Sequence, residues 1–176
     1  TALGYVLAGW LSLKLAAYLA DVVPAVWLAA GIGAMASLRF GVPGVLGVLL
    51  GSFALHSQAQ PAEDALRFAL GAAVGAGIMG YLPRHLQPFS YTLDYVSSVA
   101  KFALVAAPLG CAVSAAVGVL SMHVYGDLPA SMVLRGLWVG WLGDLLGVYL
   151  IAPLFLTASR WVLLPSRLGV GKKGLV

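Results

Sequence analysis

Six apolar stretches occupy most of the chain and constrain its fold more than any other feature. A helix needs about 20 apolar residues to cross the hydrocarbon core of a bilayer, within a range of about 17 to 25. The second and third stretches lie near the lower end of that range, and a turn containing Gly41, Pro43 and Gly44 joins them. The sequence therefore predicts an all-α integral membrane protein with about six transmembrane helices in one glycine-rich bundle. The predicted spans are residues 2–20, 23–38, 41–56, 65–82, 97–122 and 136–158.

Charged residues are too scarce to cover a water-soluble domain. The chain has 176 residues, of which 61% are hydrophobic and 9% charged, and its mean hydropathy is +0.98. A soluble domain is usually about 25% charged. We expect residues 1–160 to form one sensory bundle and residues 161–176 a basic juxtamembrane tail. Because the chain begins with Thr1 and ends in GKKGLV, we expect it to be part of a longer protein.

The distribution of lysine and arginine predicts the orientation of the bundle. One set of connections carries Arg39, Arg84, Arg160, Arg167, Lys172 and Lys173. The opposite set carries Asp21, Glu63, Asp64, Arg67, Asp127 and Arg135. The first set is the more basic, so the positive-inside rule places it and both termini in the cytoplasm. Orientation explains the net charge of +4 better than a nucleic-acid partner does.

Small residues recur at intervals of about four along several of the stretches. Such spacing forms a smooth stripe against which another helix backbone packs closely in lipid. Pro108 and Pro153 lie inside the fifth and sixth stretches, where each removes one helix hydrogen bond and kinks the helix. We assign these prolines and the following glycines to helix packing: Gly47, Gly51, Gly71, Gly75, Gly110, Gly118, Gly140, Gly143 and Gly147.

Asp144 is the one acidic residue inside the sixth stretch. At about 100° per residue, the glycines of this stretch fall within an arc of about 60°, and Asp144 lies about 40° beyond the edge of that arc. It is about eight residues, or about 12 Å, from the outer end of the stretch. A carboxylate at this depth costs at least about 2–3 kcal/mol unless it is partnered or hydrated. We therefore expect Asp144 to face the bundle interior or its margin.

Two interpretations of Lys14 stay open at this point. It lies about 9 Å deep in the first stretch, at a depth similar to that of Asp144, so the two side chains could pair. Lys14 also lies opposite the small residues of its stretch, which favours extension of its side chain to the outer surface. His56 and His123 fall near outer span ends and are interpreted as interface residues.

Catalytic and metal-binding patterns are not found in the sequence. His, Cys, Asp and Glu are not spaced as metal ligands, and phosphate loops, nucleophile elbows and paired carboxylates are also missing. We expect neither enzymatic activity nor a cofactor in this chain.

The segment WVGWLGDLLGVYLIAPLFL, residues 138–156, resembles the hallmark of the MASE family, type 1, the membrane-associated sensor modules of bacteria. Residues 27–53 and 102–120 resemble two further parts of the family, so the likeness covers residues 22–160. The chain departs from the family at Leu28 and Ala29, and its fourth stretch lacks the usual Asn and Glu. The hallmark positions matched are Trp141, Leu142, Gly143, Asp144, Leu146, Gly147, Val148, Ala152, Pro153 and Leu154.

This resemblance implies a sensory input domain of the bacterial inner membrane. Its partner in cis would be a cytoplasmic histidine kinase or diguanylate cyclase, which places it in two-component or cyclic di-GMP signalling and is compatible with a homodimer. A small ligand or a membrane protein would bind near Asp144, Trp141 and Trp27, with Lys14 as a further candidate. Binding would shift the packing of the helices, and the last span would relay that shift.

Two other functions remain open. A six-span bundle of this size also suits the substrate-binding subunit of a small-molecule transporter, in which Asp144 would contact the substrate or an ion. Alternatively, the bundle is a membrane anchor that dimerises an output domain, and Asp144 only hydrogen-bonds a neighbouring helix.

Overall fold

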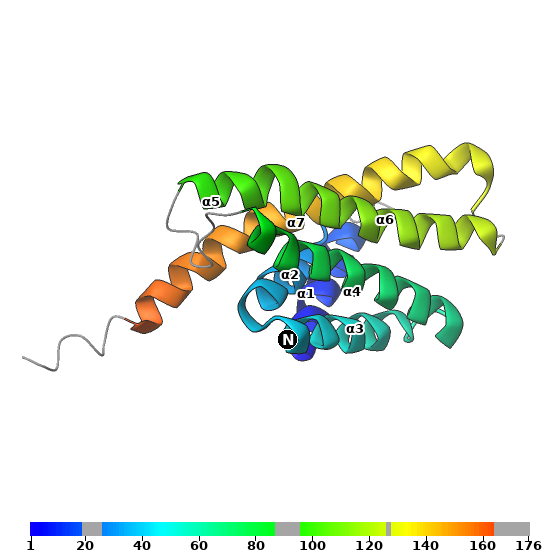
Figure 1. Ribbon diagram of the computed structural model, residues 1–176. Helices are drawn as coiled ribbons and strands as arrows, with labels where there is room; N and C mark the ends of the chain where they lie inside the picture. Colours follow the sequence, from blue (N-terminus) through cyan, green and yellow to red (C-terminus); the bar gives the residue numbers. More distant parts are fainter. Residues whose placement is uncertain (19–25, 87–95, 126–127, 164–176) are drawn as a thin grey trace, which may run out of the picture.

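The structure, a computed structural model, describes residues 1–18, 26–86, 96–125 and 128–163, with side chains as far as Phe155. Within these ranges every regular element is helical, which confirms the predicted all-α membrane bundle (Figure 1). The elements are α1 (Ala2–Tyr18), α2 (Leu28–Phe40), α3 (Val42–His56), α4 (Ala62–His85), α5 (Val96–Lys101), the π-helical turn η1 (Phe102–Ala106), α6 (Ala107–Val124) and α7 (Ala130–Leu163).

The helices fall into two length classes. Three of them are long and apolar enough to cross a membrane, judged by length and composition within the described residues: Ala62–His85, Val96–Val124 and Ala130–Phe155. Helices α1, α2 and α3 are shorter apolar helices. Their outer surfaces expose large apolar side chains, such as Leu3 at 73% and Leu50 at 63%. A soluble monomer rarely exposes contiguous apolar patches of this kind, whereas lipid covers them without cost.

The turn between α2 and α3 is as tight as the sequence predicted. Gly41 alone separates the two helices, and its φ of 65° lies in the left-handed region that favours glycine. Pro43 follows in the first turn of α3, where its missing N–H costs nothing. Gly44 then lies against the backbone of Ala36, so the two helices separate only gradually.

Helix α4 occupies the middle of the bundle and packs against α2, α3 and α6. Helix α1 packs against α2 and α3, while α7 packs against α2 and α6 (Figure 1). The core on the α7 side contains Met35, Phe102, Cys111 and Val148. The core on the α1 side contains Tyr5 of α1 together with residues of α2, α3 and α4.

The predicted packing glycines lie at helix crossings. Gly75 and Gly110 face each other where α4 crosses α6, and a Cβ on either would come 2.6 Å from the carbonyl oxygen of the other. Gly71 lies against Val117 at the same crossing. On the other side of the bundle, Gly51 lies against the backbone of α1 at Ala2. The remaining crossings are Gly47 on Thr1, Gly118 on Phe68 and Gly140 on Ala115.

The closest backbone contact joins α7 to the start of α2. The Trp27 N–H donates a hydrogen bond of 2.9 Å to the carbonyl oxygen of Gly143. A methyl group on Gly147 would overlap the Trp27 carbonyl, and one on Gly31 would overlap the backbone of Gly147. The backbone at Trp27 is non-helical, and α2 begins at Leu28. The prediction that the second helix begins at residue 23 falls partly on residues outside the described ranges.

Helix α7 extends beyond the predicted span 136–158 at both ends. It begins directly after Pro129, whose carbonyl oxygen accepts the Met132 N–H, and it continues through Pro153 to Leu163. The prediction counted only the apolar core of a longer helix. At about 1.5 Å per residue, its 34 residues extend past the other helices, as Figure 1 shows.

The π-helical turn η1 precedes Pro108, and Pro108 leaves one backbone acceptor of this turn without a helix hydrogen bond. In this turn the Ala107 N–H bonds the Phe102 carbonyl, five residues back. The next such bond would join residue 108 to Ala103, but proline has no N–H. The Tyr149 hydroxyl donates instead to the Ala103 carbonyl at 2.6 Å. A side chain of α7 therefore satisfies the acceptor that Pro108 leaves unpaired, as a spanning helix with a proline requires.

The substitution Gly147→Ala tests the α2–α7 contact. We expect a loss of about 1–3 kcal/mol in the free energy of unfolding, because the added methyl group overlaps the Trp27 backbone. The matched control is Gly77→Ala, since a Cβ there meets only Val45 at 3.9 Å and alanine favours the helix. Unfolding by sodium dodecyl sulfate in mixed micelles measures both. Equal effects of the two changes would contradict the close approach.

The substitution Tyr149→Phe tests the hydrogen bond from the Tyr149 hydroxyl to the Ala103 carbonyl at the π-helical turn. Loss of the hydroxyl leaves the Ala103 carbonyl without this donor, so we expect a destabilisation of about 1 kcal/mol. Tyr18→Phe is the control, because Tyr18 is 88% exposed. The same unfolding titration applies, and a Tyr149→Phe protein as stable as the parent would show that the bond contributes nothing.

Candidate functional site

A partly open cavity of about 200 Å³, which we call the inner cavity, lies between the helices of the bundle. Side chains from α1, α3, α4, α6 and α7 border it, together with Trp27 just before α2. Its polar lining is unusual for an apolar bundle and comprises Tyr5, Ser52, His56, Ser114 and Asp144. A smaller cavity of about 20 Å³ adjoins it and shares Tyr5, Trp27, Ser114 and Asp144 with it.

Asp144 reaches the cavity from α7. The residue is partly buried, and both of its chain neighbours, Gly143 and Leu145, are buried, so it faces the interior as the helical wheel predicted. The Ser114 hydroxyl, on α6, lies beside its carboxylate and is a donor for it. Helix α2 begins one residue after Trp27, whose N–H is bonded to Gly143. The positive end of the α2 dipole therefore lies beside the carboxylate and favours its negative charge.

Tyr5, on α1, is a second polar residue of the cavity lining. Its side chain is 2% exposed, and its hydroxyl lies beside the Trp27 and Ser52 side chains. Buried polar groups in apolar surroundings are costly unless they have hydrogen-bond partners. The start of α2 has a second support, because the Leu28 N–H donates to Ser12 Oγ at 2.9 Å. Tyr5 and Ser12 together hold α1 against this end of α2.

Three rings form a row along one side of the cavity. The His56 and Phe68 rings are stacked, with centroids 5.0 Å apart, and the Trp27 and His56 centroids are 6.1 Å apart. His56 Nδ1 lies 2.8 Å from the Ser52 carbonyl oxygen. A carbonyl only accepts, so Nδ1 carries the hydrogen of this bond. In the neutral ring Nε2 is then an acceptor.

A second cavity of about 170 Å³ lies at the end of the bundle where α3 leads into α4. We call it the vestibule, and its lining includes Gln60, Asp64, Arg67, Phe68 and Ser121. Phe68 borders the vestibule and the inner cavity alike.

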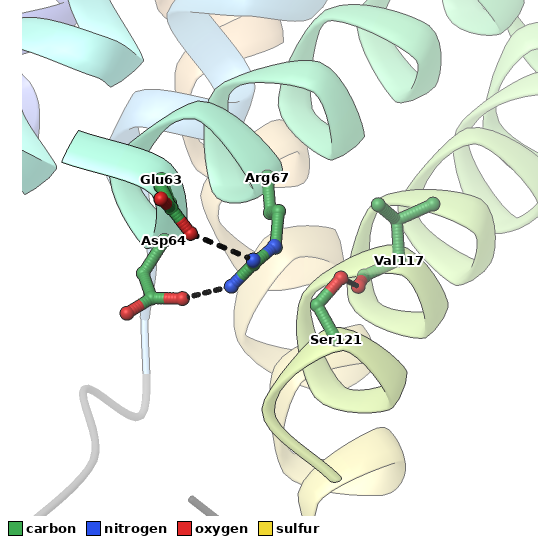
Figure 2. A network of polar contacts seen from close by, with 5 residues as sticks. All are labelled: Glu63, Asp64, Arg67, Val117 and Ser121. Atoms are coloured by element: carbon green, nitrogen blue, oxygen red, sulfur yellow. Dashed lines mark hydrogen bonds and ion pairs between the residues drawn. The ribbon is translucent and has the colours of Figure 1, made fainter. Parts of the chain in front are cut away.

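Arg67 is held in place at the vestibule by several contacts. It pairs with Asp64 and, at 3.4 Å, with Glu63 (Figure 2). Its guanidinium also lies 3.4 Å from the centroid of the Tyr125 ring. Ser121, on the facing helix α6, donates its hydroxyl to the Val117 carbonyl at 2.6 Å. Gln60 Oε1 differs from these groups, since it is buried and has no hydrogen-bond partner among the described residues.

The structure brings together two of the four residues proposed for ligand binding or signal coupling. Asp144 and Trp27 line the same cavity. Trp141 lies outside the lining, where its Nε1–H donates to the Pro108 carbonyl at 2.9 Å and its ring packs edge-on against Trp138 at 5.3 Å.

Lys14 is exposed on α1 and lies 5.8 Å from the centroid of the Trp10 ring. Of the two interpretations left open for Lys14, the structure favours extension to the surface, because the side chain is outside the cavity lining.

Sequence reasoning missed four polar residues of the site. Tyr5, Ser52 and Ser114 were not predicted as site residues, and His56 was interpreted as an interface residue. The available signal was their position: hydroxyl-bearing residues next to small residues on the inward stripe of a helix. Which of these stripes meet depends on how the helices are arranged, and spacing along one helix does not reveal it.

The family comparison agrees with this architecture. The MASE1 family model matches residues 1–169, nearly the whole chain. The chain belongs to the MASE1 family. MASE1 is a membrane-associated sensor domain of signalling proteins and is not itself catalytic. The resemblance found at residues 138–156 is thereby confirmed. Comparisons with curated proteins and with solved structures found no match.

The bond between Ser114 and Asp144 can be tested by a double-mutant cycle in this MASE1 domain. We expect Ser114→Ala to destabilise the fold by about 1–2 kcal/mol, because the carboxylate loses a donor. In an Asp144→Ala background the same change should cost about 1 kcal/mol less. Ser37→Ala is the control: its hydroxyl lies between the Ala34 and Ala76 carbonyls, outside the cavity lining. Its effect should be the same in both backgrounds, and additivity for Ser114 would contradict the bond.

Proposed function

We propose that the inner cavity is the ligand site of this sensor domain, and that α7 relays ligand binding to a signalling domain. The observation that carries the proposal is the cluster of Asp144, Tyr5, Ser52, His56 and Ser114 around a cavity inside an apolar bundle. Polar and ionisable groups at such depth are expensive and mark functional sites. A helix-packing hydrogen bond needs only two of these groups and no cavity.

Helix α7 is suited to the relay because it carries both a residue of the site and the close contact with Trp27. Asp144 lines the cavity, while Gly143 and Gly147, on consecutive turns, lie against Trp27. Trp27 lines the cavity as well. A ligand that contacts Asp144 and Trp27 changes the relative stability of the packings open to α2 and α7, which is the requirement for a population shift.

The direction of the helices supports a cytoplasmic output. Gly143 and Gly147 pack on Trp27, and Ile151 packs on Gly31 further along, so α7 runs parallel to α2. The C-terminal part of α7 therefore lies toward the end of the bundle that carries Arg39. Under the positive-inside rule this end faces the cytoplasm, where a histidine kinase or diguanylate cyclase in cis would receive the signal. The bundle would then be a multi-pass domain of the bacterial inner membrane.

Thermal unfolding across a metabolite library, with the domain in lipid nanodiscs, tests the ligand site. We expect at least one compound to raise the melting temperature of the parent, since a ligand at 100 times its Kd stabilises by about 2.7 kcal/mol. The same compound should have no effect on Asp144→Asn, which keeps the shape of the side chain and removes its charge.

Ser37→Ala serves as the matched control, because this buried serine bonds the Ala34 and Ala76 carbonyls away from the cavity. It should retain the full response to the compound. A library without any stabilising compound, combined with an Asp144→Asn variant that only loses stability, would favour the membrane-anchor function and contradict the proposal.

A further inference from the structure

We infer that the ligand of the inner cavity is a small organic cation, a protonated amine or a quaternary ammonium, which enters through the vestibule. This inference rests on the proposed function of the cavity. It names the chemical class of the ligand and its route, both of which the surrounding residues determine.

The charge of the cavity is the first argument. Asp144 contributes a carboxylate, and the described lining residues include no lysine or arginine. Lys14 lies outside the lining on the exposed face of α1. Ser114 supplies one neutral donor to the carboxylate. A carboxylate in apolar surroundings gains most from a partner of opposite charge, and here the ligand is the group that can provide one.

The other lining groups also suit an ammonium group. The rings of Trp27, Tyr5 and Phe68 border the cavity, and aromatic rings attract organic cations through their negative faces. His56 binds the Ser52 carbonyl through Nδ1, which leaves Nε2 as an acceptor for an N–H donor. An anionic ligand would meet the Asp144 carboxylate with no cationic residue of the lining to offset the repulsion.

The size of the site favours an organic cation over a metal ion. A volume of about 200 Å³ accommodates several non-hydrogen atoms. Divalent metal ions take several oxygen ligands at short range, whereas Asp144 is the only carboxylate among the described residues of the lining. The described ranges also contain no group of three or more His, Cys, Asp and Glu residues placed to hold a metal ion.

The vestibule supplies the route. Phe68 lines both cavities, and the inferred route passes its side chain. On the vestibule side, Gln60 Oε1 is a buried acceptor with no partner among the described residues. An unpaired buried acceptor is costly, and turning the Gln60 side chain toward the vestibule would let an ammonium N–H satisfy it. Asp64 lines the same space, while Arg67 is engaged by Glu63, Asp64 and Tyr125.

Isothermal titration calorimetry of the domain in lipid nanodiscs tests the inference. The probes are ethanolamine and choline, with 3,3-dimethylbutan-1-ol as the neutral isostere of choline, glycolate as an anion, and sodium and magnesium chloride as inorganic cations. We expect one or both organic cations to bind, and the neutral isostere to bind at least about 30-fold more weakly, because it forms no charge pair with Asp144.

Two variants locate the binding. Asp144→Asn should weaken binding of the organic cation by at least about 30-fold. Phe68→Leu, which keeps the carboxylate, should weaken it about fivefold through loss of the ring, and stopped-flow mixing should show faster association. Ser37→Ala should bind as the parent does. Because Phe68→Leu leaves the polar cluster intact, it provides the test if Asp144→Asn does not fold.

The outcomes separate the inference from the proposed function. Suppose that glycolate, the neutral isostere or a neutral library compound binds in a way that depends on Asp144, while the amines do not bind. This result would overturn the inference that the ligand is a cation and would leave the proposed ligand site standing. Binding of sodium or magnesium alone would do the same. Amine binding that both Asp144→Asn and Phe68→Leu leave unchanged would overturn the inference and place the site elsewhere.

Discussion

The close approach of α7 to the start of α2 determines much of the arrangement described above. Lipid gives helices no hydrophobic reason to associate, so contact depends on how near two backbones can come. At this crossing the Trp27 N–H donates a backbone hydrogen bond to the Gly143 carbonyl, and Gly147 leaves room for the Trp27 carbonyl. The same short part of α7 thus provides the contact with Trp27 and, through Asp144, the carboxylate that lines the cavity.

The polar cluster around Asp144 is distributed over several helices. Its groups lie in sets, Ser114 beside Asp144 and Tyr5 beside Trp27 and Ser52. Each such contact offsets part of the cost of placing a polar group in an apolar bundle. The arrangement leaves space between the sets, and that space is the cavity. A site built in this way responds to helix movement, because any relative shift changes several of these contacts together.

At the π-helical turn before Pro108, polar side chains of α7 likewise satisfy groups of another helix. Tyr149 satisfies the Ala103 carbonyl and Trp141 bonds the Pro108 carbonyl, so α7 is attached to the irregular part of the α5–α6 unit by two side chains. π-Helical turns often occur at functional sites. Trp141, proposed from the sequence as a residue of the ligand site, lies instead at this contact between α7 and α6. A shift of α7 would change its hydrogen bond to Pro108.

The amino-acid sequence by itself determined the helical membrane class, the positions of the apolar helices, the turn at Gly41 and the inward direction of Asp144. These properties depend on composition and on spacing along single helices, which one sequence displays directly. Tertiary structure alone decided that Tyr5, Ser52, His56 and Ser114 gather around Asp144, that Lys14 lies outside, and that α2 starts at Leu28. Those outcomes depend on which helix faces meet, and glycine-mediated contacts between distant segments set that choice.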